Sequence, residues 1–248
     1  MNVAARGSVV AALRRAVPVF FSARLFALVL LPLVVAMLAW LAVAWWAWEP
    51  LVRWLAHSLF AWSDRFGGTA AGILAALLLM FAAVLTALTA IAVLAMPVIV
   101  EGVAARDFAA LERRRGGTFA GSLDNAVGTI GVFVPLWLLA LPLLAFPPVY
   151  VATGIVLNAW VNQRLFRYDA LALHADPAEL RAVVHSARGR LFRLGLAVAP
   201  LSFVPLLNLL APFYAGIAFT YLCLDELAAL RARAVTASNA DAGVTRSG

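Results

Sequence analysis

Lysine is absent from this chain, and cysteine and charged residues are scarce. Charged residues make up 12% of the 248 positions, about half of the usual share in a soluble protein. The single cysteine, Cys223, excludes an intrachain disulfide, and no group of Cys, His and acidic residues has the spacing of a metal site. We therefore expect neither a disulfide framework nor a bound metal.

The sequence also lacks the short motifs of common active sites. It contains no HExxH zinc-protease motif, no GxSxG nucleophile elbow, no phosphate-binding loop and no dinucleotide fingerprint. Its long uncharged stretches contain no Asp or Glu, which argues against proton-coupled transport through an intramembrane acid. We expect a protein that is not an enzyme and uses no cofactor.

What the chain has in abundance is apolar residues, at 65% of the sequence with a mean hydropathy of +0.97. This composition indicates an integral membrane protein. The net charge of +7 comes from arginines that flank apolar runs, a pattern of cytoplasmic anchoring and headgroup contact rather than of nucleic-acid binding. The arginine-only basic residues and the abundant alanine suggest a GC-rich bacterial genome, and hence a bacterial inner membrane.

Four stretches are free of charge and long enough to enter a membrane. A helix needs about 20 apolar residues to cross the hydrocarbon core. The first two stretches predict two long transmembrane helices, whereas prolines divide the other two into arms too short for full crossings. The stretches are Leu25–Trp48, Phe66–Val100, Asn125–Gln163 and Leu194–Leu224.

The prolines of the last two stretches predict helix breaks. Pro147 and Pro148 divide the third stretch, and Pro205 and Pro212 bracket Asn208 in the fourth. Within hydrocarbon, a broken backbone is tolerated only where protein or a water-filled cavity satisfies its amide groups. We interpret these segments as re-entrant, hemi-penetrating helical hairpins at a functional cavity. The alternative is a proline-kinked core helix in which Asn208 bonds to a neighbour.

The distribution of arginine predicts the topology. With two crossings and two same-side hairpins, every arginine-rich segment lies in the cytoplasm, as do both termini, and only the loop 49–65 lies outside. Apolar residues at helical spacing in this loop predict an interfacial helix. The fold class is an all-α integral membrane protein with one membrane domain over residues 1–234. The small polar residues of 235–248 predict a disordered tail.

Two helix starts can be read from capping residues. Asp176, Pro177 and Glu179 form an N-cap, a first-position proline and a third-position acid. Ser122, with Asn125 three residues later, is a candidate N-cap for the third stretch.

Uncharged polar residues near the broken helices are the candidate anion-binding groups. Asn158 and Asn162 are four residues apart and share a helix face, and Ser202 and Asn208 lie in the last hairpin. Amides and hydroxyls near helix N-termini can hold an anion, and Arg24 could supply a formal charge. The alternatives are structural hydrogen bonds between helices and, for Arg24, an interfacial anchor.

Three segments resemble the family of bacterial CysZ-type sulfate permeases and etoposide-induced membrane proteins. They are SARLFALVLLPLVV from Ser22, NQRLFRYDALALHADPAELR from Asn162, and VPLLNLLAPFYAGIAFTYLCLDEL near the C-terminus. The resemblance extends from about Ala12 to Arg233. It implies two long transmembrane helices, two hemi-penetrating hairpins and a homo-oligomer in the lipid bilayer.

The resemblance also implies inward conduction of sulfate or sulfite for cysteine biosynthesis. One motif departs from the family. A Gly-Leu-Arg turn precedes the first span in CysZ proteins, whereas Ser22, Ala23 and Arg24 stand here, so the arginine is kept without the glycine. Ser22 and Arg24 are therefore candidate substrate-binding residues.

Two functions remain open at this point. The first is an anion permease or channel, with Arg24 attracting the ion and the broken hairpins lining its path. The second is a non-transporting membrane scaffold or assembly factor, which would dock partners or anionic lipid through arginine-rich segments such as 113–115. Loss of flux on replacing Asn208 by leucine would distinguish the permease from the scaffold.

Overall fold

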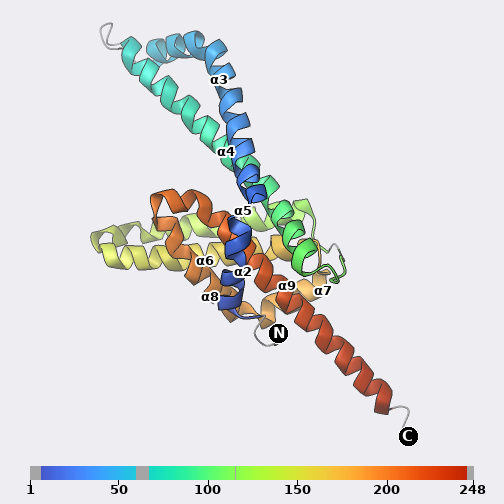
Figure 1. Cartoon of the computed structure of the whole chain (residues 1–248). Helices are drawn as coiled ribbons and strands as arrows, with labels where there is room; N and C mark the ends of the chain where they lie inside the picture. Colours follow the sequence, from blue (N-terminus) through green and yellow to red (C-terminus); the bar gives the residue numbers. More distant parts are fainter. Residues whose placement is uncertain (1–6, 60–66, 115, 245–248) are drawn as a thin grey trace. The chain divides into compact units, whose positions relative to one another are not determined.

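The computed structural model describes residues 7–59, 67–114 and 116–244, and all regular secondary structure there is helical (Figure 1). Some side chains in these helices, including those of Arg24 and Asn208, lie outside the described part. The elements are α2 (Val9–Phe20), α3 (Ala23–Leu59), α4 (Gly67–Asp107), α5 (Phe119–Ala140), η1 (Leu141–Ala145), α6 (Pro147–Ala172), α7 (Pro177–Ser186), α8 (Arg188–Val198), η2 (Ala199–Phe203) and α9 (Pro205–Val244).

Within the described residues, four segments are long and apolar enough to cross a membrane, which confirms the predicted all-α membrane class. They are Val34–Leu59, Gly67–Thr86, Ala120–Ala145 and Leu210–Ala237. The chain divides into two compact units. The smaller unit is Ala23–Ala95, and the larger unit combines Met1–Ser22 with Met96–Gly248.

The smaller unit is an antiparallel pair formed by α3 and most of α4. Leu55, only 2% exposed, packs against Ala71 and Ala75, and the Trp40 indole nitrogen donates to the Thr86 hydroxyl at 3.2 Å. The segment predicted as a separate interfacial helix is part of α3, which curves over at its far end (Figure 1). Most other apolar side chains of this pair are exposed, as lipid contact requires.

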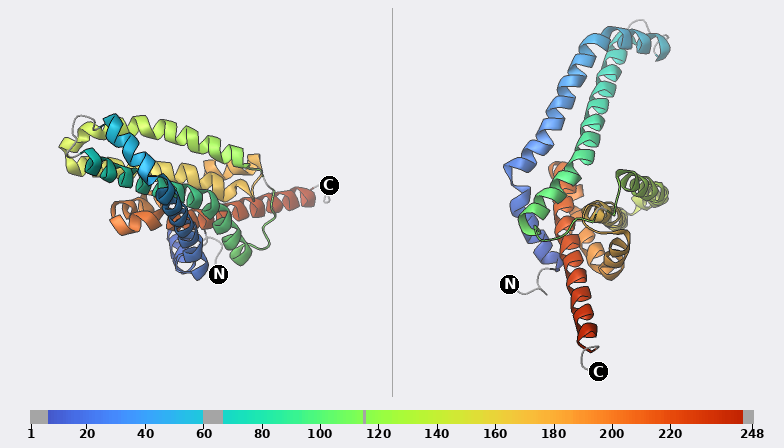
Figure 2. Two further views of the ribbon diagram at one scale, coloured as in Figure 1. Left: turned by 90° about the horizontal axis from the view of Figure 1, so that it is seen from above. Right: turned by 90° about the vertical axis from the view of Figure 1, so that its right-hand side faces the viewer.

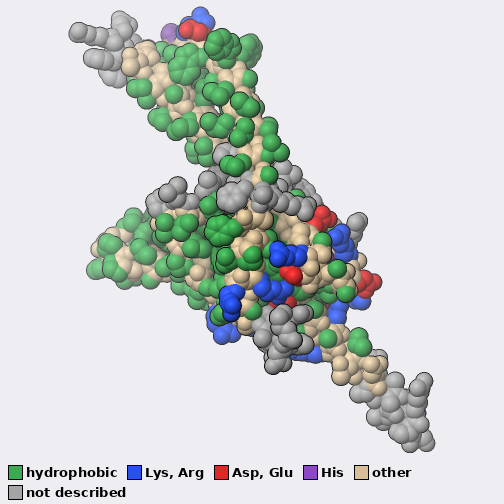
Figure 3. Space-filling view, viewed as in Figure 1, with side chains coloured by type: hydrophobic (Ala, Val, Ile, Leu, Met, Phe, Trp, Pro, Cys, Tyr) green, Lys and Arg blue, Asp and Glu red, His purple; other side chains and the backbone are tan. Residues whose placement is uncertain are grey.

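The larger unit is built around α9. Ile217, Phe219 and Leu222 of α9 are fully buried, and α2, α6 and α8 pack against this helix while α5 covers α6. Two helical hairpins result, one from α5, η1 and α6 and the other from α8, η2 and α9 (Figure 2). On the face seen in Figure 3, hydrophobic side chains cover the hairpin tips, and charged ones gather at the opposite end of this unit.

The two hairpins turn at prolines. Pro147 and Pro148 occupy the first positions of α6 after the 3₁₀ turn η1, where a missing amide hydrogen costs nothing. Val204 is extended, with φ −96° and ψ 117°, because the residue before a proline avoids the helical region, and Pro205 then begins α9. Both predicted breaks are confirmed.

Pro212 does not break a helix, contrary to the sequence prediction. It lies inside α9, which continues through it to Val244. Its neighbours Ala211 and Phe213 are each 5% exposed, so packing on both sides holds the helix although one backbone hydrogen bond is missing.

The tail predicted as disordered from Val235 is also helical as far as Val244. Its many alanines favour a helix, and it extends a helix that is already fixed by burial, so no new nucleation is required. Residues 245–248 lie outside the described part.

Of the two helix starts predicted from capping residues, one is correct and one is wrong. The Asp176 carboxylate accepts hydrogen bonds from the amides of Ala178 and Glu179, and the Glu179 carboxylate accepts one from the Asp176 amide. This capping box begins α7 as predicted. By contrast, Thr118 rather than Ser122 caps α5, and Ser122 instead donates a hydrogen bond to Asp169 of α6.

The crossing of α6 and α8 depends on Gly195. A Cβ atom at Gly195 would lie 2.5 Å from the Ala159 carbonyl oxygen, a contact with backbone that can be relieved only by moving a helix. We expect Gly195→Ala to lower the free energy of unfolding by about 1–3 kcal/mol. Gly189→Ala, on the same helix with open space around it, is the control and should not destabilise. Equal effects in a denaturant titration would contradict this role.

Candidate functional site

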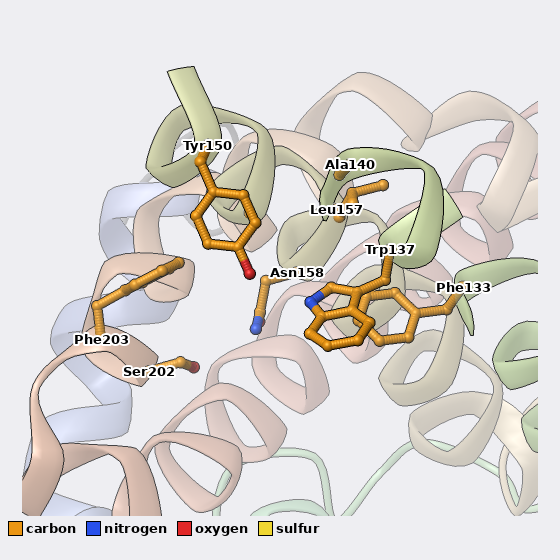
Figure 4. Close-up of a pocket in the computed structure, with 9 residues that line it drawn as sticks. Phe133, Trp137, Ala140, Tyr150, Leu157, Asn158, Ser202 and Phe203 are labelled. Carbon is orange, nitrogen blue, oxygen red and sulfur yellow. The ribbon is translucent and has the colours of Figure 1, made fainter. Parts of the chain in front are cut away.

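A pocket of about 270 Å³ lies where η2, at the turn of the second hairpin, meets the first turns of α6 and the end of α5 (Figure 4). It is formed entirely within the larger unit, by the end of α5, the first three turns of α6 and the turn η2. Its lining residues are Phe133, Trp137, Ala140, Tyr150, Gly154, Leu157, Asn158, Ser202 and Phe203. The proline turns thus place a polar-edged cavity at the breaks in the helices.

The polar groups of the pocket converge on Asn158. The Tyr150 hydroxyl, the Ser202 hydroxyl and the indole nitrogen of Trp137 all point toward it (Figure 4). Each of these side chains can donate a hydrogen bond, and the indole can only donate. The pocket therefore presents several neutral donors to one point, with aromatic rings around them.

A neighbouring amide orients Asn158. The Asn162 side-chain nitrogen donates to the Asn158 side-chain oxygen at 2.8 Å, which occupies the acceptor of Asn158 and leaves its NH₂ group facing the pocket. Gly154, one turn earlier, makes room for η2, because a Cβ there would lie 3.2 Å from the Phe203 ring. The helix spacing of Gly154, Asn158 and Asn162 puts all three on one side of α6.

The pocket's electrostatics come from dipoles, since no lining residue is charged. Tyr150 lies in the first turn of α6, and Ser202 and Phe203 lie directly before the start of α9 at Pro205. A helix N-terminus carries the equivalent of roughly half a positive charge. The C-terminal ends of α5 at Ala140 and of η2 at Phe203 line the same pocket and carry opposite partial charges, so the converging neutral donors are the feature that suits a small anion.

The structure brings together some of the predicted site residues. Asn158 and Ser202, which are far apart in sequence, line the same pocket, and Asn162 supports it from one turn away. Ser22, between α2 and α3, does not line this pocket. The side chains of Arg24 and Asn208 lie outside the described part, so their predicted roles remain predictions.

The aromatic residues of the pocket were not among the site residues predicted from the sequence. Tyr150 precedes Asn158 by eight residues, or two steps of four. Because residues four apart share a helix face, this spacing could have placed Tyr150 beside Asn158. Trp137 and Phe203 gave no comparable signal. They resemble lipid-facing aromatics in an apolar run, and only the meeting of the two hairpins assigns them to a pocket.

Comparison with protein families matches residues 12–212 to the family described as sulfate transporter CysZ/etoposide-induced protein 2.4. The chain belongs to this family. Among curated proteins, none matches the sequence significantly. The region shared with the CysZ/etoposide-induced family runs from α2 into the first turns of α9 and contains both hairpin turns and the whole pocket.

Proposed function

We propose that this protein is an inner-membrane anion permease or channel that takes up sulfate for cysteine biosynthesis. It acts as a conduit and not as an enzyme, and it works as a homo-oligomer with both termini in the cytoplasm. The observation that carries the proposal is the uncharged, donor-lined pocket at the helix breaks, in a chain of the CysZ/etoposide-induced family.

Neutral donors suit a conduit because the ion must leave as readily as it enters. A buried arginine would hold sulfate strongly, whereas hydroxyl, indole and amide groups replace part of its hydration shell without a full counter-charge. An acidic residue in the pocket would repel the ion, and no lining residue is acidic.

The two hairpins are proposed to enter the membrane from the cytoplasmic side and turn within it. Their tips are apolar apart from the pocket, whereas the ion-paired residues of the larger unit, including Arg15, Arg190 and Arg231, lie toward the other end. In the proposed arrangement the pocket lies within the bilayer.

Asn158→Asp is the sharpest test of this function. The two side chains have nearly the same shape, but a carboxylate would replace an NH₂ donor with a negative charge. We expect saturable uptake of radiolabelled sulfate into proteoliposomes to fall at least tenfold, corresponding to about 1.4 kcal/mol or more. Asn239→Asp, an exposed position on the distal part of α9, makes the same charge change and should leave uptake unchanged.

The alternative of a docking scaffold predicts a different result. Folded wild-type protein would then show no uptake above empty vesicles, and this outcome would overturn the permease proposal. The arginines assigned to docking are already engaged within the chain. Arg113 pairs with Glu101 at 3.5 Å, and Arg114 pairs with Glu112 at 3.1 Å and Glu179 at 3.0 Å. Arg115 lies outside the described part.

A further inference from the structure

Three arginines on α6 and α8 have no ion pair within the described residues. Arg164 and Arg167 lie one turn apart near the end of α6, and Arg188 is the first residue of α8. Arg15 and Arg190, which are partly buried as Arg164 and Arg167 are, do have acidic partners in Asp225 and Glu226, and Arg188 is exposed.

The packing of α6 against α8 brings the three residues to the same end of the two helices. Gly154 of α6 contacts Phe203, and Ala159 contacts Gly195, so the two helices run in opposite directions. Arg167 follows Ala159 by about two turns and Arg188 precedes Gly195 by about two turns, which places them side by side. The charges of Arg164 and Arg188 both act on Arg167.

The environment of these arginines is unfavourable for cations. Burial, followed by repulsion from Arg164 and Arg188, lowers the pKa of Arg167. The Arg164 guanidinium has a favourable cation–π contact with the Trp160 ring at 5.4 Å, but its buried Nε atom has no hydrogen-bond partner in the described part of the chain. Arg188 also starts a helix that has no side-chain cap, where the helix dipole disfavours a positive charge.

The nearest acid on α6 does not neutralise the group. Asp169 accepts a hydrogen bond from Ser122 of α5 and forms no ion pair with these arginines in the described part of the chain. Burial raises the pKa of Asp169, so this carboxylate is a poor source of negative charge. An anion from outside the chain would relieve the repulsion among the three arginines, satisfy Arg164 Nε and compensate the α8 dipole.

We propose that Arg164, Arg167 and Arg188 form a second oxyanion site, which binds a sulfate or phosphate group. Arginine favours such groups because its planar donors match their oxygen atoms. The site is distinct from the hairpin-tip pocket, since Arg167 lies roughly 13 Å along α6 from Asn158. It requires no transport activity, so it stands independently of the proposed permease function. The group can belong to a free anion or to a lipid headgroup.

Thermal unfolding in nonionic detergent at constant ionic strength tests the site, with sulfate as the titrated probe. The wild-type Tm should rise with sulfate and saturate. Arg167→Gln should have a Tm equal to or above the wild type without sulfate, because a repulsive charge is removed, and should require at least tenfold more sulfate for the same rise. Arg181→Gln, an exposed arginine on α7, should respond as the wild type does.

A wild-type Tm that is independent of sulfate, phosphate and anionic lipid would overturn the proposal, as would Arg167→Gln and Arg188→Gln variants that respond like the wild type. Arg188 is exposed, so its variant tests the site even if Arg167→Gln fails to fold. Nanodiscs of phosphatidylcholine with or without phosphatidylglycerol identify the source. A Tm rise with phosphatidylglycerol supports a headgroup occupant, and a rise with free anions alone supports a soluble one.

Discussion

Replacing Arg15 by alanine is expected to lower the free energy of unfolding by about 3–5 kcal/mol. Arg15 on α2 donates from Nη1 to both carboxylate oxygens of Asp225 on α9, at 2.9 and 3.1 Å. The Asp225 side chain is only 3% exposed, so its charge would remain buried after removal of this cation. The guanidinium also lies 4.2 Å from the centre of the Tyr221 ring, and the alanine variant cannot make this cation–π interaction.

The matched control is Arg14→Ala, one residue earlier on the exposed face of α2, which should change stability by less than about 0.5 kcal/mol. Unfolding in mixed micelles with increasing denaturing detergent, followed by tryptophan fluorescence, measures both variants. The double variant Arg15→Met/Asp225→Met should lose less stability than the sum of the two single variants, because both charges of the ion pair are removed together. Equal losses of stability for Arg14→Ala and Arg15→Ala would show that the ion pair does not hold α2 on α9.

Arg231→Ala should lower the free energy of unfolding by about 1–3 kcal/mol, because several hydrogen bonds are lost while Glu179 keeps its pairing with Arg114. Arg231 of α9 donates to both Glu179 carboxylate oxygens at 2.8 Å, to the Glu112 carbonyl at 2.8 Å and to the His174 carbonyl at 2.7 Å. It thereby joins α7 and the loop after α4 to the central helix. Arg233→Ala, exposed on the same helix, removes the same charge without these contacts and should be nearly neutral. Limited proteolysis of the loop around Glu112 should accelerate only in Arg231→Ala.

Lowering the pH should reduce the difference in Tm between the wild type and Arg231→Ala. Hydrogen bonds from Arg231 are the main cause that lowers the pKa of Glu179 below its ordinary value of 4.5. A carboxylate with a lowered pKa stabilises the folded protein fully above its ordinary value and loses that contribution as the pH falls through the lower one. The gap in Tm between wild type and Arg231→Ala should therefore narrow below pH 4.5. A gap that stays constant would mean that the carbonyl contacts, rather than Glu179, account for the effect.

Local sequence signals predicted those features that depend on a few neighbouring residues. Pro147 and Pro148 had to begin a helix, since a proline lacks the amide hydrogen needed further along. The spacing of Asp176 and Glu179 predicted the start of α7. The same local reasoning failed at Pro212, because burial of its neighbours outweighs a single missing hydrogen bond.

The sequence by itself determined that this is a helical membrane protein with two hairpins that turn at prolines, because apolar length and proline chemistry act locally along the chain. It also identified Asn158 and Ser202 as candidates, since polar residues are conspicuous in apolar runs. Only the tertiary structure decided that these two share a pocket with Tyr150 and Trp137, and that Arg15 and Arg231 have acidic partners while Arg167 has none in the described chain. Such pairings depend on how helices distant in sequence cross, and residue spacing along one helix contains no information about its neighbour.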